Sequence, residues 1–145
     1  MSSVLRKMFK TANALETKGI TLEYGEGVEI IVARAGGANT KFAKCLNRLT
    51  KAHRSAIQND ILSDVMGREI LLQAYAETVV LDWKGVTQDV LSGKEEDATT
   101  PLECTVDNVK AVFTELPDLF LDVQKMAQQI SAFRAEIMDT DSKNL

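Results

Sequence analysis

The sequence predicts a mostly α-helical protein of the α+β class, with an N-terminal helix and a β-hairpin followed by a bundle of about four helices. Apolar residues recur at helical spacing over most of the chain, which indicates amphipathic helices. Two short runs of alternating apolar and polar residues flank a glycine-containing turn, which is typical of a hairpin. The length of 145 residues suits one domain, and we expect residues 1–145 to form it.

The helix and the hairpin are expected at the start of the chain. Residues 1–18 contain apolar side chains at helical spacing between Val4 and Leu15, which predicts an amphipathic helix or a terminal arm. Residues 19–35 contain the two alternating runs, one on each side of residues 25–27, and therefore form the predicted hairpin.

Residues 39–138 are predicted to form the helical bundle. Its first helix should start near Asn39 or Thr40, because both residues are favourable N-caps. A second helix, apolar around much of its circumference, is expected from about residue 60 to residue 83. Gly67 interrupts this helix, and since glycine costs about 1 kcal/mol in a helix interior, we expect close packing there.

A long loop is predicted to divide this bundle at residues 85–104, where few apolar residues are periodic. Two more helices should follow it. The first is capped by Thr105, and the second starts at Pro117 and ends near Met138. Residues 139–145 form a polar tail.

No metal or cofactor is expected. The two cysteines, Cys45 and Cys104, lie far apart and form neither a CxxC pair nor a Cys/His cluster, so two free thiols are predicted. The N-terminus lacks the apolar segment of a secretory signal, and no stretch approaches 18 apolar residues. We therefore expect a cytoplasmic protein that makes no membrane contact.

The sequence contains no recognisable catalytic set, and we expect the protein not to be an enzyme. His53 is the only histidine, and it falls on the apolar stripe of its predicted helix without a nucleophile motif beside it. A packed or interface histidine explains this position better than a catalytic base.

Charge is distributed unevenly along the chain. Residues 1–59 contain ten Lys and Arg against four Asp and Glu, a net charge of +6, whereas residues 60–145 contain seven against seventeen, a net charge of −10. Such a chain can steer partners or self-associate head to tail, or its halves can neutralise each other within the fold. Four basic residues of the helix after Asn39 lie opposite its apolar stripe and are candidate partner-binding residues. They are Lys41, Lys44, Arg48 and Lys51.

This basic face also raises the alternative of a nucleic-acid-binding module, in which Arg54 would join the stripe. The low isoelectric point of about 5.1 and the lack of aromatic residues between the basic ones argue against a nucleic-acid partner.

Several short motifs resemble the tail assembly chaperones of long-tailed bacteriophages and related small tail proteins. In that group a helix ends in a W-x-G-V/I element, a loop with a Pro-containing piece follows, and a capped apolar helix and a "PDL" come next. The resemblance covers about residues 18–130, including the hairpin and the basic helix. A departure is the acidic run at residues 94–97, where relatives tend to be shorter. The matching positions are Leu81, Asp82, Trp83, Gly85, Val86, Pro101, Leu102, Thr105, Asn108, Pro117, Asp118 and Leu119.

The resemblance implies a non-enzymatic chaperone in the host cytoplasm that binds the tape-measure protein and promotes assembly of the tail tube. The implied partners are the tape-measure protein or tail tube subunits. The alternative is a structural head or tail subunit that stays in the virion.

Trp83, the only tryptophan, has two interpretations. Followed by Gly85 as a helix stop, it can close a corner of the core. Tryptophan is also enriched among the residues that anchor a partner, so Trp83 is a candidate partner-binding residue as well.

Overall fold

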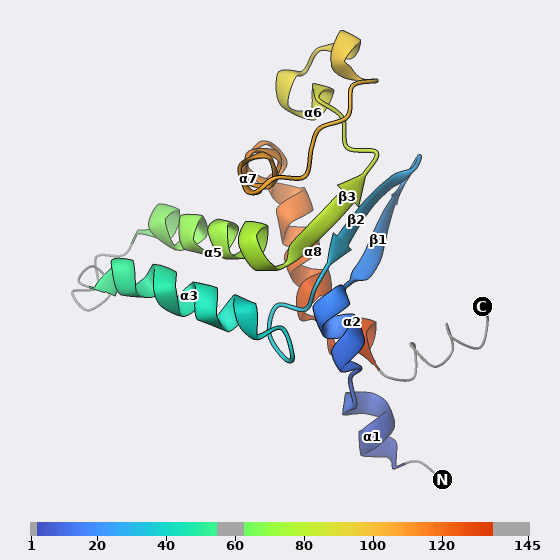
Figure 1. Cartoon of the computed structure of the whole chain (residues 1–145), viewed down its shortest axis with the longest axis vertical. Helices are drawn as coiled ribbons and strands as arrows, with labels where there is room; N and C mark the ends of the chain where they lie inside the picture. The colour runs from blue at the N-terminus through green and yellow to red at the C-terminus, as the bar shows by residue number, and fades with distance from the viewer. Residues whose placement is uncertain (1–2, 55–62, 135–145) are drawn as a thin grey trace.

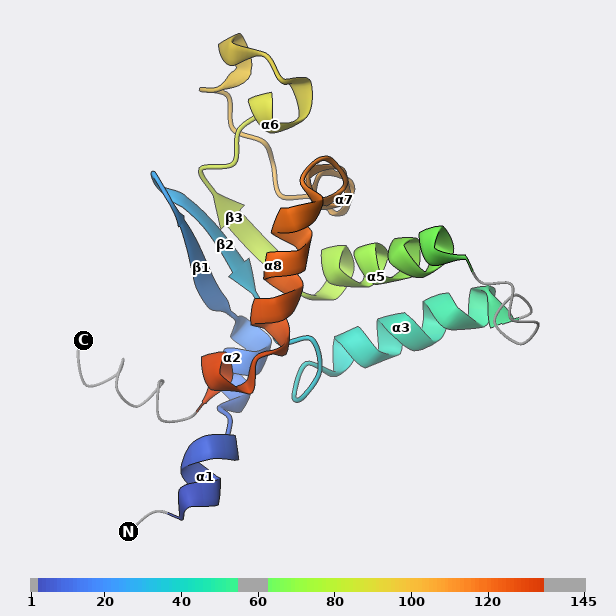
Figure 2. The ribbon, with the colours of Figure 1, turned by 180° about the vertical axis from the view of Figure 1, so that it is seen from behind.

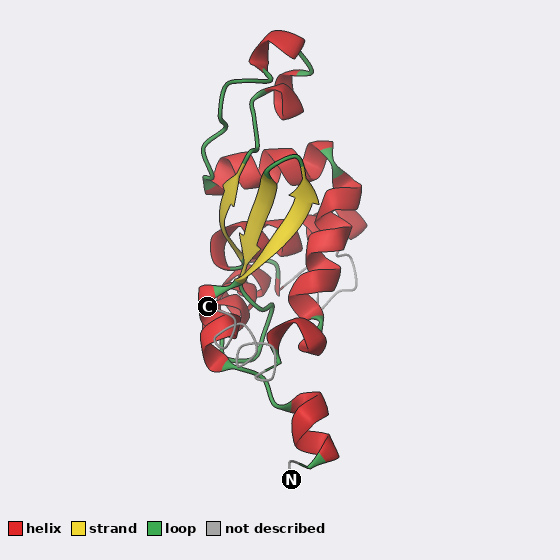
Figure 3. Ribbon diagram, turned by 90° about the vertical axis from the view of Figure 1, so that its right-hand side faces the viewer, coloured by secondary structure: helices red, strands yellow, loops and turns green. Residues whose placement is uncertain are grey.

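A three-stranded antiparallel sheet, in the order β1-β2-β3, carries most of the helices on one face (Figures 1 and 3). The computed structural model describes residues 3–54 and 63–134. Its elements are α1 (Val4–Phe9), α2 (Asn13–Lys18), β1 (Ile20–Gly25), β2 (Val28–Val32), α3 (Thr40–Ala52), α5 (Asp64–Thr78), β3 (Val80–Lys84), α6 (Asp89–Ser92), the 3-10 helix η1 (Glu95–Asp97), α7 (Val106–Glu115), α8 (Pro117–Gln128) and the 3-10 helix η2 (Ile130–Phe133).

The structure confirms the predicted fold class, because N-terminal helices and a hairpin precede the other helices. The hairpin β1–β2 has the predicted position, and its strands pair from Ile20 opposite Val32 to Gly25 opposite Val28. None of the helices within the described ranges has both the length and the apolar character needed to cross a membrane.

The helix predicted to run to residue 83 ends earlier, at Thr78, and the chain continues as strand β3. Trp83 lies opposite Ile30 in the pairing of β3 with β2. The prediction was wrong because this stretch is apolar without a clear period, and such a run fits a buried strand as well as a helix. The predicted start at Asp60 lies outside the described residues, and Ser63 caps the observed helix by accepting from the Met66 N–H at 3.1 Å.

The predicted N-terminal helix is divided into α1 and α2. Between them, Thr11 pairs with Arg134 as an isolated bridge, and the Ala12 N–H donates to the Phe133 carbonyl at 2.8 Å. A long-range contact with the chain after α8 therefore sets the break. Helical spacing over residues 4–15 cannot reveal such a contact.

The predicted loop at residues 85–104 is an ordered stalk that projects from the end of the sheet with α6 and η1 at its tip (Figure 1). Its two sides pair through Thr87 and Pro101, and the Leu102 N–H donates to the Val86 carbonyl at 2.9 Å. The last predicted helix ends at Gln128 and is followed by η2. Its predicted end near Met138 and the polar tail at 139–145 lie outside the described residues.

Tyr75 of α5 lies at the centre of the helical core and is fully buried. Its ring meets the rings of Phe42 on α3 and Phe120 on α8 edge-on, with centroid distances of 5.4 Å in both cases. Phe120 in turn stacks on Phe113 of α7 at 5.0 Å. Gln128 donates to the Tyr75 hydroxyl at 3.1 Å, so the polar end of the buried ring is also satisfied.

Trp83 is buried on the same side of the sheet, where its indole Nε1 donates to the Leu102 carbonyl at 2.7 Å. The ring thus packs in the core and holds the base of the stalk to β3. This position agrees with the interpretation that Trp83 closes a corner of the core. Trp83 lies on strand β3, however, and not at the end of a helix.

Glu16 of α2 is a buried carboxylate that holds the loop after β2. Its side chain is 2% exposed and accepts from Arg34 Nη1 at 2.7 Å and from the Ala38 N–H at 2.5 Å. Gly37 has φ +55°, and a Cβ there would lie 2.6 Å from the Glu16 carboxylate, so only glycine lets the loop wrap so closely. Burial acts to raise the pKa of Glu16, but hydrogen bonds from Thr11, Ala38 and Arg34 outweigh it and lower the pKa.

Asn39 stands at the predicted N-cap of α3 but does not cap the helix with its side chain. Its Nδ2 instead donates to the Arg34 carbonyl at 2.8 Å and to the Thr78 carbonyl at 3.0 Å. The residue therefore ties the loop after β2 to the C-terminal end of α5.

We predict that replacing Glu16 by Gln lowers the free energy of unfolding by about 2 kcal/mol at pH 7, because Arg34 loses its charged partner in a largely buried site. A carboxylate whose pKa falls on folding stabilises the native state above its unfolded pKa. This stabilisation should be lost in the wild type as the pH drops below the ordinary glutamate value of 4.5.

Urea denaturation of both proteins at pH 7 and pH 3 measures this effect. The two proteins should differ at pH 7, and the difference should be smaller at pH 3, because the carboxylate of the wild type begins to bind a proton in that range. Glu115→Gln, at the exposed end of α7, is the matched control and should stay within about 0.5 kcal/mol of the wild type. Equal stabilities of Glu16→Gln and wild type at pH 7 would contradict the role given to this carboxylate.

Candidate partner-binding site

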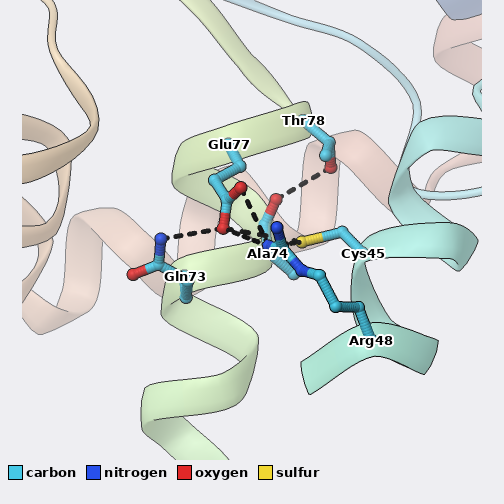
Figure 4. Close-up of polar contacts among 6 residues, drawn as sticks. All are labelled: Cys45, Arg48, Gln73, Ala74, Glu77 and Thr78. Atoms are coloured by element: carbon cyan, nitrogen blue, oxygen red, sulfur yellow. Dashed lines mark hydrogen bonds and ion pairs between the residues drawn. The ribbon is translucent and has the colours of Figure 1, made fainter. Parts of the chain in front are cut away.

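The basic face of α3 carries three exposed lysines and one arginine that is bound within the fold. Arg48 Nη2 donates to both carboxylate oxygens of Glu77 on α5, at 2.7 and 2.9 Å (Figure 4). Within residues 3–54 and 63–134, no acidic side chain forms an ion pair with Lys41, Lys44 or Lys51. The stripe predicted from sequence is therefore available to a partner at its lysines, whereas Arg48 joins α3 to α5.

Cys45 lies beside this ion pair, with its sulfur 3.4 Å from Arg48 Nη2 and 3.7 Å from a Glu77 oxygen (Figure 4). Gln73 donates to the same carboxylate at 2.8 Å. Burial, and after it the charge of Glu77, raise the pKa of the Cys45 thiol against the opposing effect of Arg48. The thiol is therefore protonated at neutral pH and is a poor nucleophile.

The other candidate reactive groups lie apart from this cluster. Burial and the charge of Asp82 raise the pKa of the Cys104 thiol to about 11. His53 is half-buried just after α3, where its backbone N–H donates to the Thr50 and Lys51 carbonyls. In the part of the chain that the structure describes, no group of three or more His, Cys, Asp or Glu residues is placed to hold a metal ion.

A groove between α5 and α8 is an apolar surface feature that the sequence did not predict. Its volume is about 290 Å³. Leu121 on its wall is 61% exposed, although it is a large apolar residue. The lining residues are Gly67, Arg68, Leu71, Pro117, Phe120, Leu121 and Gln124.

Gly67 lies in this groove and has no packing reason to be glycine. A Cβ built on it meets no atom of the described residues within 4 Å, so the prediction of close packing at this position is wrong for this part of the chain. The glycine instead leaves the groove open beside Leu71, while Arg68 Nη2 extends toward the Phe113 carbonyl at 3.5 Å. A helix-interior glycine that meets no atom of residues 3–54 and 63–134 suits a surface that another molecule approaches.

One signal in the sequence points to this groove. The core-facing residues of α8 include Phe120 and Val123, both buried. Leu121 falls about 100° from Phe120 around the helix axis, outside that apolar stripe. A large apolar residue off the core face, combined with a glycine inside an apolar helix, is the pattern that sequence reasoning could have used.

A family model described as YdaY prophage protein matches residues 37–144 of the 145-residue chain. The matched stretch starts in the loop after β2 and spans α3 to α8, so it includes both walls of the groove. No curated protein and no solved structure matches the chain. The match confirms the phage origin that the resemblance implied, and its description mentions neither a tail nor a chaperone.

We predict that Gly67→Ala raises the free energy of unfolding by about 0.5–1 kcal/mol, because alanine favours the helix and the added methyl group has space. Thermal and urea unfolding followed by circular dichroism measure the change. A loss of stability would mean that the groove is closed in solution, and would contradict the open site described above.

Proposed function

The chain belongs to the YdaY prophage protein family, and we propose, from the motifs that resemble tail assembly chaperones, that it is a non-enzymatic tail assembly chaperone. In this proposal, the groove between α5 and α8 binds an amphipathic helical segment of the phage tape-measure protein and thereby promotes assembly of the tail tube. The observation that carries the proposal is the open apolar groove beside Gly67 and the exposed Leu121.

The size and form of the groove favour a protein partner. Its volume of about 290 Å³ lies just below the roughly 300–1,000 Å³ typical of small-molecule sites. A groove between two helices suits the anchoring side chains of a third helix, which recur at positions i, i+3 or i+4 and i+7. A tape-measure protein is expected to be long and helical, and to expose apolar surface until other proteins cover it.

Two of the residues that resemble tail assembly chaperones have a structural role in this chain. Trp83 and Val86, for example, are buried and build the junction of β3 and the stalk. Partner contact is therefore assigned to other residues. The exposed Lys41, Lys44 and Lys51 lie on α3, outside the groove lining, and would attract an acidic segment of the partner at a second contact.

The proposal gives no chemical step to the cluster around Cys45. A buried thiol with a raised pKa suits packing between α3 and α5 better than nucleophilic attack. Under this proposal the chain acts in the host cytoplasm and is absent from finished particles, whereas a structural head or tail subunit would remain in them.

We predict that Leu121→Asp weakens binding to overlapping fragments of the tape-measure protein of the same prophage by at least tenfold, because it places a charge in the apolar groove. Isothermal titration calorimetry measures the affinity. Leu91→Asp is the matched control, since Leu91 is also an exposed leucine but lies in α6 on the stalk, and this variant should bind like the wild type.

Circular dichroism should show that both variants fold as the wild type does, because both replaced side chains are exposed. Equal affinity of Leu121→Asp and wild type for the tape-measure fragments would refute the groove as the binding site. The same conclusion would follow if Leu91→Asp lost as much affinity as Leu121→Asp.

A further inference from the structure

We propose that the α5/α8 groove of one copy is occupied by helix α1 of a second copy until the partner displaces it. The inference rests on the proposed function in one respect, namely that both occupants use the same groove. The proposal also names the two surfaces that would meet when copies of the chain associate. The uneven distribution of charge along the sequence does not identify such surfaces.

Helix α1 carries an apolar face that the described residues of its own chain leave exposed. No residue of α1 is buried, and Leu5 and Phe9 are 68% and 57% exposed. Val4 and Met8 are also exposed, and helical spacing places all four side chains on one face. A helix of six residues is marginal by itself in water, so this apolar face requires a surface to pack against.

The structure holds α1 away from the groove of its own chain. The helix contacts η2, where Arg134 Nε donates to the Met8 carbonyl at 3.1 Å. Figures 1 and 2 show α1 beyond α2, at the end of the molecule opposite the stalk, whereas α5 and α8 meet near α7. The groove that α1 can reach is therefore that of another copy.

The charges of the two surfaces are complementary. Arg6 and Lys7 lie on α1, Lys10 follows it directly, and α1 contains no acidic residue. Around the groove, Asp64 lies one turn before Arg68 on α5, and Asp118 lies in the first turn of α8. Both of these carboxylates are exposed, as is that of Glu115 at the end of α7.

Arg68 is the only cationic residue among the described residues that line the groove.

The apolar and charged parts of the contact can form together. The apolar face of α1 would enter the groove beside Gly67 and Leu121, while its long basic side chains reach from the other face toward the acidic rim. Such a contact joins two different surfaces, so each copy keeps one α1 and one groove for further copies. Contacts of this head-to-tail type build rings or open chains rather than two-fold dimers.

Sedimentation equilibrium over a range of protein concentrations tests the inference. The wild type should self-associate, and Phe9→Glu on α1 and Leu121→Asp in the groove should each be monomeric. The control Leu91→Asp should self-associate like the wild type. An equimolar mixture of Phe9→Glu and Leu121→Asp should form 1:1 dimers and nothing larger, because the mixture has one intact α1 and one intact groove in each pair.

A monomeric wild type, continued self-association of Phe9→Glu, or failure of the mixture to dimerise would each overturn the inference. Binding of the wild-type protein to anionic lipid vesicles without any self-association would overturn it in favour of a membrane surface as the partner of α1.

Binding of the tape-measure fragments separates this inference from the proposed function. Phe9→Glu keeps its groove and should bind the fragments at least as tightly as the wild type. If no variant binds these fragments but the mixture dimerises, only the proposed function fails.

Discussion

The helical layer of this protein depends on the buried ring of Tyr75. Its edge-on contacts with Phe42 and Phe120 place α3 and α8 on different sides of α5, and Gln128 satisfies its hydroxyl. Aromatic pairs of this kind contribute about 0.5–1.5 kcal/mol each beyond the burial of their area. Because α5 and α8 are held together at Tyr75 and Phe120, the groove persists where Gly67 supplies no side chain to fill it.

The buried Glu16 plays the corresponding role at the other end of the molecule. Its contacts with Arg34 and Ala38 bind α2 to the loop after β2, and Asn39 extends that loop to the end of α5. The chain before α2 is held by the hydrogen bonds of Ala12 with Phe133 and of Met8 with Arg134, and α1 projects beyond the packed layers (Figure 2). The described residues thus present two exposed apolar surfaces, the groove and α1, which the proposed function and the proposed self-association would use.

The sequence predicted the elements whose pattern is periodic and local. The hairpin and α3 were placed correctly, because alternation and helical spacing are properties of single segments. Strand β3 was missed because an apolar run without a period fits either structure. The pairing of Arg48 with Glu77 could not be predicted, since these residues lie 29 positions apart. Gly67 was misjudged because the cost of glycine does not reveal whether the space beside it is filled.

Site-specific photo-crosslinking from position 121 during prophage induction tests the central claim most directly. A photoreactive residue in place of Leu121 should form an adduct with the tape-measure protein, identified by mass spectrometry. The same residue in place of Leu91 should not form this adduct. The absence of any tail-protein adduct from position 121, or equal adducts from positions 121 and 91, would contradict the assignment of the α5/α8 groove as the partner-binding site.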